Sequence, residues 1–490
     1  MAPLLVAVLG AAVSLAGAGR PSFWYDEAAT ISASYSRSLP ELWQMLRDVD
    51  AVHGLYYVLM HGWFSVVPPT EFWSRVPSGL AVGAAAAGVM VLGTQLTSRT
   101  VGVVAGVMCA ILPRSTWAGI EARPYALSMT AAVWLAVLLV CACRRESRWL
   151  WVGYGALLGV SVVLDVYLAL LVFAHAVFVV MFARRAWVRF AVASSAALVV
   201  TAPFVAVVAG QAKQVAWITP IGLRTFEDVA VQQYFDRSPY FAVLAALVVV
   251  AAAAVWATAR FDSGERAAVA LAVGWIVFPT TVIVAYSAIA EPLYTPRYLC
   301  FTAPAMALLL GVCIVALARS GWIAATVVAL FAVVAAHNHV AVQRGPYAKY
   351  GMDYSPVADL ITASAAPGDC LLVNDTVTFH PAPMRPLLAA RPDAYRPLID
   401  VSLWQRATDT RAVFDTNLIP EASVGPLERC ATVWIVTQAD PLAPVHETGV
   451  AIPPGPLFGS TRAFAVTHDL GLRLVQRWQF NLVQVIKAVR

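Results

Sequence analysis

The chain has 490 residues, of which 60% are hydrophobic and only 12% are charged. Soluble domains carry about 25% charged residues, so this composition excludes an ordinary soluble protein and indicates an integral membrane protein. The net charge of +5 comes from scattered basic residues, many of them in short loops between apolar runs, where they orient helices. The charge therefore does not predict nucleic acid as a partner.

Apolar runs recur along the first two thirds of the chain, and a spanning helix needs about 20 such residues. By this criterion we predict a polytopic α-helical membrane protein with about eleven spans. Their ranges are 3–19, 75–96, 101–117, 124–142, 149–164, 167–183, 189–209, 239–259, 267–289, 298–318 and 322–341. The first run lacks the charged start of a signal peptide, although Ala16-Gly17-Ala18 is similar to a cleavage site, and we interpret it as an uncleaved span.

The loops on the two sides of these spans differ in charge. Alternate loops are short and rich in arginine, which makes them cytoplasmic by the positive-inside rule. The N-terminus is then cytoplasmic, and loops 20–74 and 210–238, the segment around 291–297 and the C-terminal region lie outside. We therefore predict a multi-pass protein of the cell membrane with an extracytoplasmic C-terminal domain.

Loop 20–74 begins with the most informative motif, Trp24-Tyr25-Asp26-Glu27. Two adjacent carboxylates at a membrane edge are costly to desolvate and uncommon without a role. Aromatic residues, Phe23 included, flank them and hold them near the bilayer. We predict that Asp26 and Glu27 are catalytic, with Asp26 as the general base; solvated loop carboxylates or a helix cap are the alternative.

The rest of this loop is too long for a plain connector. Ranges Leu39–Val49 and Leu55–Val66 are amphipathic and predict interfacial helices on the outer leaflet, which either cap the bundle or serve function. His53 and Tyr57 are candidate substrate contacts in this aromatic-rich part. A single loop histidine is more often structural or solvated, so this alternative stays open for His53.

Arginines recur where spans begin on the outer side. Arg75 opens the second span, Arg123 lies in Glu121-Ala122-Arg123-Pro124-Tyr125, and Arg297 and Tyr298 open a later span. All fall on the face of the membrane that carries Asp26. The planar fork of arginine suits phosphate, so Arg123, Arg297 and, third, Arg75 are predicted to bind an anionic headgroup. A snorkelling arginine with a local acidic partner is the alternative. Glu121, Tyr125 and Tyr298 are candidate substrate contacts.

From residue 343 the composition changes, and we divide the chain into a membrane module, 1–342, and an α/β domain, 343–490. The pattern predicts a helix over Tyr354–Ala365 and strands at Cys370–Val373 and Thr432–Val436. Leu472–Val475 and Phe480–Ile486 are expected to pair. Cys370 and Cys430 can form a disulfide if this part is extracytoplasmic, a pairing that stays open. The other cysteines have no metal-ligand spacing, and we expect no metal and no cofactor.

The order of Trp24-Tyr25-Asp26-Glu27, Arg75-Val76-Pro77-Ser78, Glu121-Ala122-Arg123-Pro124-Tyr125 and Pro296-Arg297-Tyr298-Leu299 resembles the GT-C superfamily of glycosyltransferases. The resemblance covers about 1–340 and is greatest to the protein O-mannosyltransferase and aminoarabinose-transferase branch, especially actinobacterial membrane mannosyltransferase-like proteins. It implies a polyprenyl-phosphate sugar donor, with mannose the expected sugar and arabinose the alternative. It also implies inversion at the anomeric carbon and a base that corresponds to Asp26.

The C-terminal part resembles extracytoplasmic domains that contact the acceptor, which is expected to be a glycolipid, a glycan or a protein. The chain departs from the family pattern at Asp165-Val166-Tyr167, where many relatives carry a histidine. A lipid or glycan transporter or flippase is the main rival, and a non-catalytic scaffold is another. Transporters place charges near the bilayer midplane, often within internal repeats. Here the charges cluster at one rim, which favours an enzyme.

Overall fold

The computed structural model describes residues 1–145, 147–258, 262–374 and 384–490. The chain divides into two compact units. The first, which we call the helical unit, contains Met1–Ala18, Asp50–Tyr56 and Arg75–Arg344. The second, which we call the sheet unit, contains Gly19–Val49, Tyr57–Ser74 and Gly345–Arg490. Most of loop 20–74 therefore belongs with the C-terminal part of the chain.

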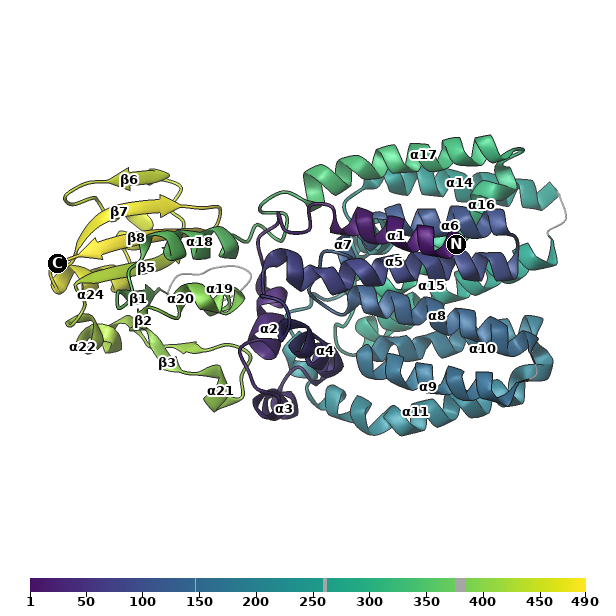
Figure 1. Ribbon diagram of the computed structural model, residues 1–490, viewed down its shortest axis with the longest axis horizontal. Coiled ribbons are helices and arrows are strands. Elements are labelled where there is room, and N and C mark those ends of the chain that lie inside the picture. The colour runs from purple at the N-terminus through teal and green to yellow at the C-terminus, as the bar shows by residue number, and fades with distance from the viewer. Residues whose placement is uncertain (146, 259–261, 375–383) are drawn as a thin grey trace. The chain divides into compact units, whose positions relative to one another are not determined.

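The helical unit is a bundle of long apolar helices that lie side by side (Figure 1). Its main helices are α1 (Ala2–Leu15), α5 (Glu71–Leu96, which begins in the sheet unit), α6 (Arg99–Ile111), α7 (Pro113–Ala118), α8 (Tyr125–Arg144), α9 (Arg148–Leu164), α10 (Leu171–Phe182), α11 (Trp187–Gly210), α14 (Pro239–Thr258), α15 (Ser263–Ile289), α16 (Ala303–Leu317) and α17 (Gly321–His337). Each predicted span overlaps at least one of them.

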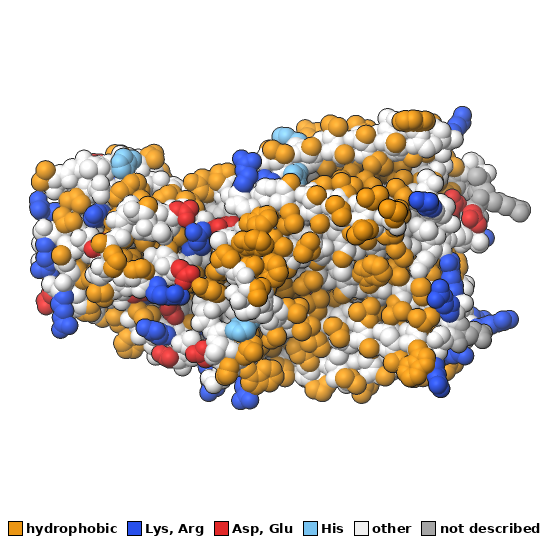
Figure 2. All heavy atoms as spheres, viewed as in Figure 1, with side chains coloured by type: hydrophobic (Ala, Val, Ile, Leu, Met, Phe, Trp, Pro, Cys, Tyr) orange, Lys and Arg blue, Asp and Glu red, His pale blue; other side chains and the backbone are white. Residues whose placement is uncertain are grey.

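Among the described residues, seven helices are long and apolar enough to cross a membrane. Four further apolar helices are shorter: Ala2–Leu15, Arg99–Ile111, Arg148–Leu164 and Val166–Phe182. The chain is thus a multi-pass membrane protein, and the number of about eleven spans stays a prediction. On the face shown in Figure 2, hydrophobic side chains cover the bundle, while Lys and Arg gather at the end where α8 joins α9 and α10 joins α11.

Small residues let the helices of this bundle approach closely, as is common between membrane helices. A Cβ atom at Gly83 of α5 would lie 2.4 Å from the Ala7 carbonyl oxygen of α1. A Cβ atom at Gly311 of α16 would lie 2.5 Å from the Ala105 Cβ atom of α6. Larger side chains at these two glycines would force the helix pairs apart.

The predicted span 101–117 is interrupted. Helix α6 ends at Ile111, and a separate short helix, α7, begins at Pro113. A proline has no backbone N–H to donate and clashes with the preceding turn, so a continuous helix through it is disfavoured. The break puts Arg114 into the protein interior, where its guanidinium lies 3.6 Å from the Asp236 carboxylate.

The sheet unit is built on a six-stranded sheet with the order β2-β1-β5-β8-β7-β6, which Figure 1 shows from bottom to top. Strand β1 pairs in parallel with β2 and β5, and the other neighbours are antiparallel. The strands are β1 (Cys370–Val373), β2 (Ile399–Asp400), β5 (Thr432–Gln438), β6 (His446–Thr448), β7 (Arg473–Gln479) and β8 (Val483–Val489), with a separate pair of β3 (Leu403–Gln405) and β4 (Thr416–Asn417). The strand predicted at Cys370–Val373 has those bounds, and the strand predicted at Thr432–Val436 extends to Gln438. The predicted pairing of the last two strands is confirmed, although each strand begins and ends later than predicted.

Helices accompany the sheet: α18 (Tyr354–Ser364), α19 (Arg385–Ala390), α20 (Pro392–Tyr395), α21 (Ala407–Thr410), α22 (Val424–Leu427), α23 (Pro456–Gly459) and α24 (Arg462–Asp469). A turn before α18 fixes that helix on the β7–β8 hairpin. The Asp353 carboxylate accepts the backbone N–H groups of Leu482 and Val483 at 2.6 and 2.9 Å. Asn481 donates to the carbonyl of Gly351, whose φ of +78° suits glycine.

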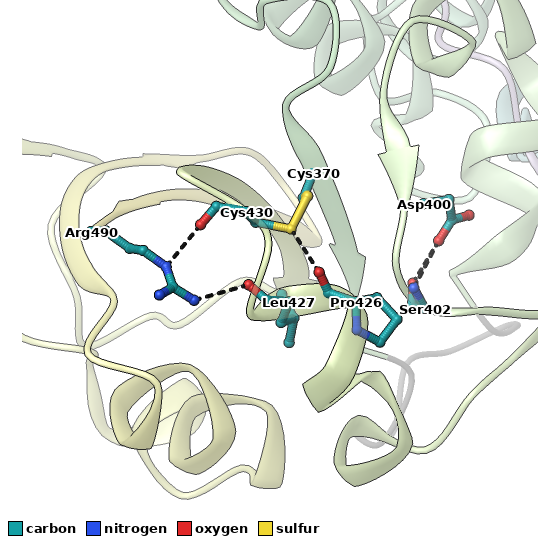
Figure 3. Close-up of a disulfide and its surroundings, with 7 residues drawn as sticks. All are labelled: Cys370, Asp400, Ser402, Pro426, Leu427, Cys430 and Arg490. Carbon is teal, nitrogen blue, oxygen red and sulfur yellow. Dashed lines mark hydrogen bonds between the residues drawn. A yellow bond between two sulfur atoms is a disulfide. The ribbon is translucent and has the colours of Figure 1, made fainter.

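Cys370 and Cys430 form a disulfide that joins the start of β1 to the segment before β5 (Figure 3). The pairing left open by the sequence is therefore present. Arg490 at the end of the chain donates to the carbonyls of Cys430 and Leu427 and closes the same corner. The five other cysteines are free.

Three helices precede the bundle in the long first loop: α2 (Tyr25–Ser34), α3 (Leu39–Asp48) and α4 (Gly54–Phe64). Helices α3 and α4 match the two amphipathic stretches within two residues at each end. Helix α3 starts with a capping box in which Ser38 and Glu41 bond each other's backbone. Helix α2, which begins inside the Trp-Tyr-Asp-Glu motif, was not predicted.

Candidate functional site

Asp26 and Glu27 occupy the first turn of α2. Negative side chains are favoured there because the N-terminus of a helix carries a partial positive charge. Glu27 is completely buried, whereas Asp26 is partly exposed. Of the two predicted catalytic carboxylates, Asp26 is therefore the more accessible one.

The start of α2 is fixed by reciprocal hydrogen bonds to the start of α18. The Phe23 N–H donates to the Ser355 hydroxyl, and the Ser355 N–H donates to the Ser22 hydroxyl, both at 3.0 Å. Phe23 is fully buried, and the Trp24 ring packs on Tyr350 with 4.5 Å between centroids. The aromatic flank predicted to hold the carboxylates near the bilayer thus packs inside the sheet unit.

Tyr354, the first residue of α18, lies near Asp26. Its pKa is raised by burial and then by the negative charges of Asp353, Tyr25 and Asp26. Tyr57 of α4, a predicted substrate contact, is fully buried and close to Arg37. Arg37 donates to the Ser32 carbonyl at 2.6 Å and to the Ala412 carbonyl at 2.5 Å. This geometry places Tyr57 in the packing of the first loop, and its contact with substrate stays a prediction.

His53, Arg123 and Arg297 come together in the helical unit. His53 ends the short helix η1 (Ala51–His53), Arg123 precedes α8, and Arg297 begins η6 (Pro296–Thr302). The pKa of His53 lies well below its usual value because of burial and then because of the positive charges of Arg123 and Arg297. The structure therefore brings two guanidinium groups from distant parts of the chain near enough to the His53 imidazole for their charges to lower its pKa.

Aromatic rings surround the Arg297 guanidinium. It lies 4.8 Å from the centre of the Trp217 ring and 5.8 Å from the Tyr298 ring. Tyr298 in turn stacks on Tyr167 with 5.9 Å between centroids. Faces of aromatic rings attract cations, so these contacts hold the guanidinium in place. The N–H groups of a guanidinium all lie in its own plane.

The Arg75 and Glu121 motifs are joined to each other. The Ser78 hydroxyl donates to the Glu121 carbonyl at 2.6 Å, and Glu121 itself is fully buried. Arg75 is also fully buried and donates to the Ala18 carbonyl at 2.7 Å. Arg75 thus holds the chain just beyond α1, and a role in phosphate binding stays a prediction for it. Tyr125 packs on Trp117 with 5.4 Å between ring centroids.

Each unit therefore carries its own share of the predicted site residues. Asp26, Glu27 and Tyr57 belong to the sheet unit, and the other predicted site residues belong to the helical unit: Arg75, Arg123, Arg297, His53, Glu121, Tyr125 and Tyr298. A shared cavity for Asp26 and the arginines stays a prediction. In the described ranges, no group of three or more His, Cys, Asp or Glu residues is placed to hold a metal ion.

Several buried polar residues of the helical unit were not found from the sequence. Arg114 and Asp236 form a buried pair, and the Gln343 side chain donates to Asp236 at 2.9 Å. Arg344 donates to the carbonyls of Ser14 and Ala16 at 2.8 and 3.0 Å and so satisfies the end of α1. The one available signal was Pro113-Arg114 inside an apolar run, which marks a broken helix.

Comparison with known proteins shows which solved structures have a similar fold. No family model matches the sequence, and no curated protein matches it. The chain is similar to the crystal structure of apo ArnT from Cupriavidus metallidurans, with 13% identity over 99% of this chain and 97% of that chain and a TM-score of 0.64. ArnT bound to undecaprenyl phosphate gives 14% identity over 99% and 97% of the two chains and a TM-score of 0.60.

The apo oligosaccharyltransferase of Archaeoglobus fulgidus is also similar, with 11% identity over 89% of this chain and 69% of that chain and a TM-score of 0.50. ArnT, an aminoarabinose transferase, and the archaeal enzyme are both GT-C glycosyltransferases. The resemblance drawn from the four motifs is confirmed at the level of the fold.

Proposed function

We propose that this chain is a membrane glycosyltransferase that transfers a sugar from a polyprenyl-phosphate donor to an extracytoplasmic acceptor. The observation that carries the proposal is the meeting of Arg123 and Arg297 beside His53. The GT-C fold supports the reaction class, and undecaprenyl phosphate bound to ArnT supports the class of donor. Mannose is the expected sugar, with arabinose the alternative.

The arginines suit the departure of a lipid phosphate. As the bond between the anomeric carbon and the phosphate oxygen breaks, that oxygen keeps the electron pair and gains negative charge. Guanidinium groups already in place stabilise this charge without reorganisation. His53 stays neutral at pH 7, so it offers hydrogen bonding without a third positive charge.

Asp26 is our candidate for the base. The acceptor hydroxyl attacks the anomeric carbon from the face opposite the phosphate, which inverts the configuration, and its proton passes to the carboxylate. Asp26 is partly exposed and opens α2, so it can take this proton. Glu27 is buried beside it, where it supports the geometry of this turn or contacts the sugar.

We further place the sheet unit on the extracytoplasmic side and the N-terminus in the cytoplasm. Disulfides persist in oxidising compartments and are rare in the cytosol, so the Cys370–Cys430 bond supports this orientation. The acceptor, a glycolipid, a glycan or a protein, then meets the sheet unit outside the cell.

The role of Asp26 is tested by Asp26→Asn, with Asp48→Asn as the control. Asp48 is an exposed acid of the same loop, 52% exposed and 3.6 Å from Arg411. Membranes are supplied with labelled undecaprenyl-phosphate mannose or arabinose, and label is followed into lipid, glycan and protein fractions. We expect Asp26→Asn to lower the transfer rate about 10²- to 10⁴-fold and Asp48→Asn to leave it unchanged. Equal rates for both variants would remove Asp26 from this role.

The phosphate site is tested by Arg297→Ala, with Arg148→Ala as the control. Arg148 also lies over an indole ring, that of Trp149 at 5.4 Å, but at the start of α9. We expect Arg297→Ala to raise KM for the donor far more than KM for the acceptor, and Arg148→Ala to change neither. A larger effect on the acceptor would place the phosphate elsewhere. A flippase would move the lipid without any labelled product.

A further inference from the structure

Trp217 is an exposed aromatic residue held directly against the candidate phosphate site. Trp217 is 55% exposed, and the Arg297 guanidinium lies 4.8 Å from its ring centre. The next residue, Ile218, is buried and anchors the segment. An exposed indole of this kind has one face on a cation and the rest of its apolar surface available to a ligand.

The segment that carries Trp217 is fixed by the first loop. The Gln211 side chain accepts the Ala51 N–H at 2.9 Å, and the Gln214 side chain accepts the Asp50 N–H at 3.1 Å. Gln211 immediately precedes the short helix η4 (Ala212–Val215), and Gln214 lies within it. The same bonds therefore position both η1, which ends at His53, and the turn that leads to Trp217. The indole is held beside the cluster of His53 and the arginines before any ligand binds.

We propose that Trp217 contacts the hydrocarbon chain of the donor next to its phosphate. A polyprenyl phosphate has an anionic group bonded directly to an isoprene carbon chain. The N–H groups that bind phosphate oxygens lie in the plane of a guanidinium, so an indole over its face does not cover them. The exposed part of the same indole then covers the first isoprene units. Arg297 and Trp217 together thus recognise both the charge and the apolar chain of one ligand.

Two other roles of Trp217 at the site, and one away from it, predict different behaviour. As a positioning residue it would act only through Arg297, and would matter equally for any phosphate. As a member of an acceptor groove, formed by the outer loop 210–238, it would affect the acceptor and not the donor. As an interfacial anchor, common for tryptophan at membrane surfaces, it would affect neither.

The experiment compares two phosphates that differ only in their carbon chain. Geranyl phosphate and methyl phosphate compete with labelled undecaprenyl phosphate for the purified full-length protein in detergent. The variants are Trp217→Ala and Trp217→Phe, with Trp149→Ala as the matched control. Trp149 is 69% exposed and also lies against an arginine, Arg148. Thermal unfolding of each variant confirms that the protein is folded.

We expect Trp217→Ala to raise the inhibition constant of geranyl phosphate about tenfold and that of methyl phosphate less than about twofold. Trp217→Phe should restore most of the loss, and Trp149→Ala should change neither constant. Equal rises for both phosphates, or no rise for either, would overturn the proposal.

This inference rests on the proposed donor site, and Arg297→Ala separates the two. If Arg297→Ala weakens both phosphates while Trp217→Ala weakens neither or both alike, only the role of Trp217 fails. If Arg297→Ala leaves both unchanged, the phosphate site itself fails.

Discussion

The disulfide gives a stability prediction whose size follows from the chain. Cys370 and Cys430 are 60 residues apart, and in the chain-entropy account a crosslink of this span removes about 14 cal/mol/K from the unfolded ensemble. At 25 °C this is worth about 4 kcal/mol to the folded sheet unit. Both cysteines are buried, so alanine at these positions also loses a little packing. We therefore expect Cys370→Ala with Cys430→Ala to destabilise the sheet unit by about 4 kcal/mol.

Pulse proteolysis in urea of the full-length protein, followed with an antibody to a C-terminal tag, measures this change. With a denaturant slope of about 2 kcal/mol/M, the midpoint should fall by about 2 M. A reducing agent should lower the midpoint of the wild type by a similar amount and should not affect the double variant. Cys313→Ala, a buried free cysteine of α16 in the helical unit, is the control.

A shift below about 0.5 M in the double variant would refute the entropic reasoning. A wild type that is insensitive to reduction while the double variant is destabilised would show that packing, and not the crosslink, is the source of the stability.

Three further predictions concern buried charges. Burial raises the pKa of Asp353 to about 6, so the folded state binds this proton more tightly than the unfolded state does. The stability of the sheet unit should therefore fall as the pH rises from about 4 to 6, and the thermal unfolding midpoint of Asp353→Asn should lack this dependence on pH. The pKa of His53 is lowered in the folded state, so the stability that the neutral side chain contributes is present above about pH 6.5 and is lost as the pH falls. The unfolding midpoint of His53→Gln should therefore fall less at acid pH than that of the wild type. Arg114→Ala or Asp236→Ala should each cost about 3–5 kcal/mol by leaving a buried charge alone, and the double variant should cost less than their sum in unfolding assays.

The length of the apolar runs predicted the positions of the membrane helices well, because a helix in lipid must be apolar over most of its length. The local sequence pattern did not predict features that depend on contacts between residues far apart in the chain. The break at Pro113 follows from backbone chemistry, but the burial of Arg114 depends on Asp236, more than a hundred residues away. Strand β7 runs beyond the predicted end at Val475 and includes Arg477, a residue atypical of a buried strand, which pairs with Glu447 at 2.7 Å.

The candidate site was found in part. The arginines were singled out by their place at the outer ends of spans, and the structure brings Arg123 and Arg297 to the same histidine. The start of α2 at Tyr25 was missed because the motif is aromatic and acidic rather than periodic. The contact of Trp217 with Arg297 could not be predicted, since nothing in the local sequence points to a residue eighty positions later.

The bonds that join Ser22 and Phe23 to Ser355 have a consequence for protein engineering. The proposed base is carried by the same compact body as the C-terminal sheet, although more than 300 residues separate them in the chain. A chimera that exchanged only residues 345–490 with another transferase would leave α2 docked on a foreign surface. Exchanging acceptor preference between transferases therefore requires exchanging 19–49, 57–74 and 345–490 together, so that Asp26 is replaced with the whole sheet unit that carries it.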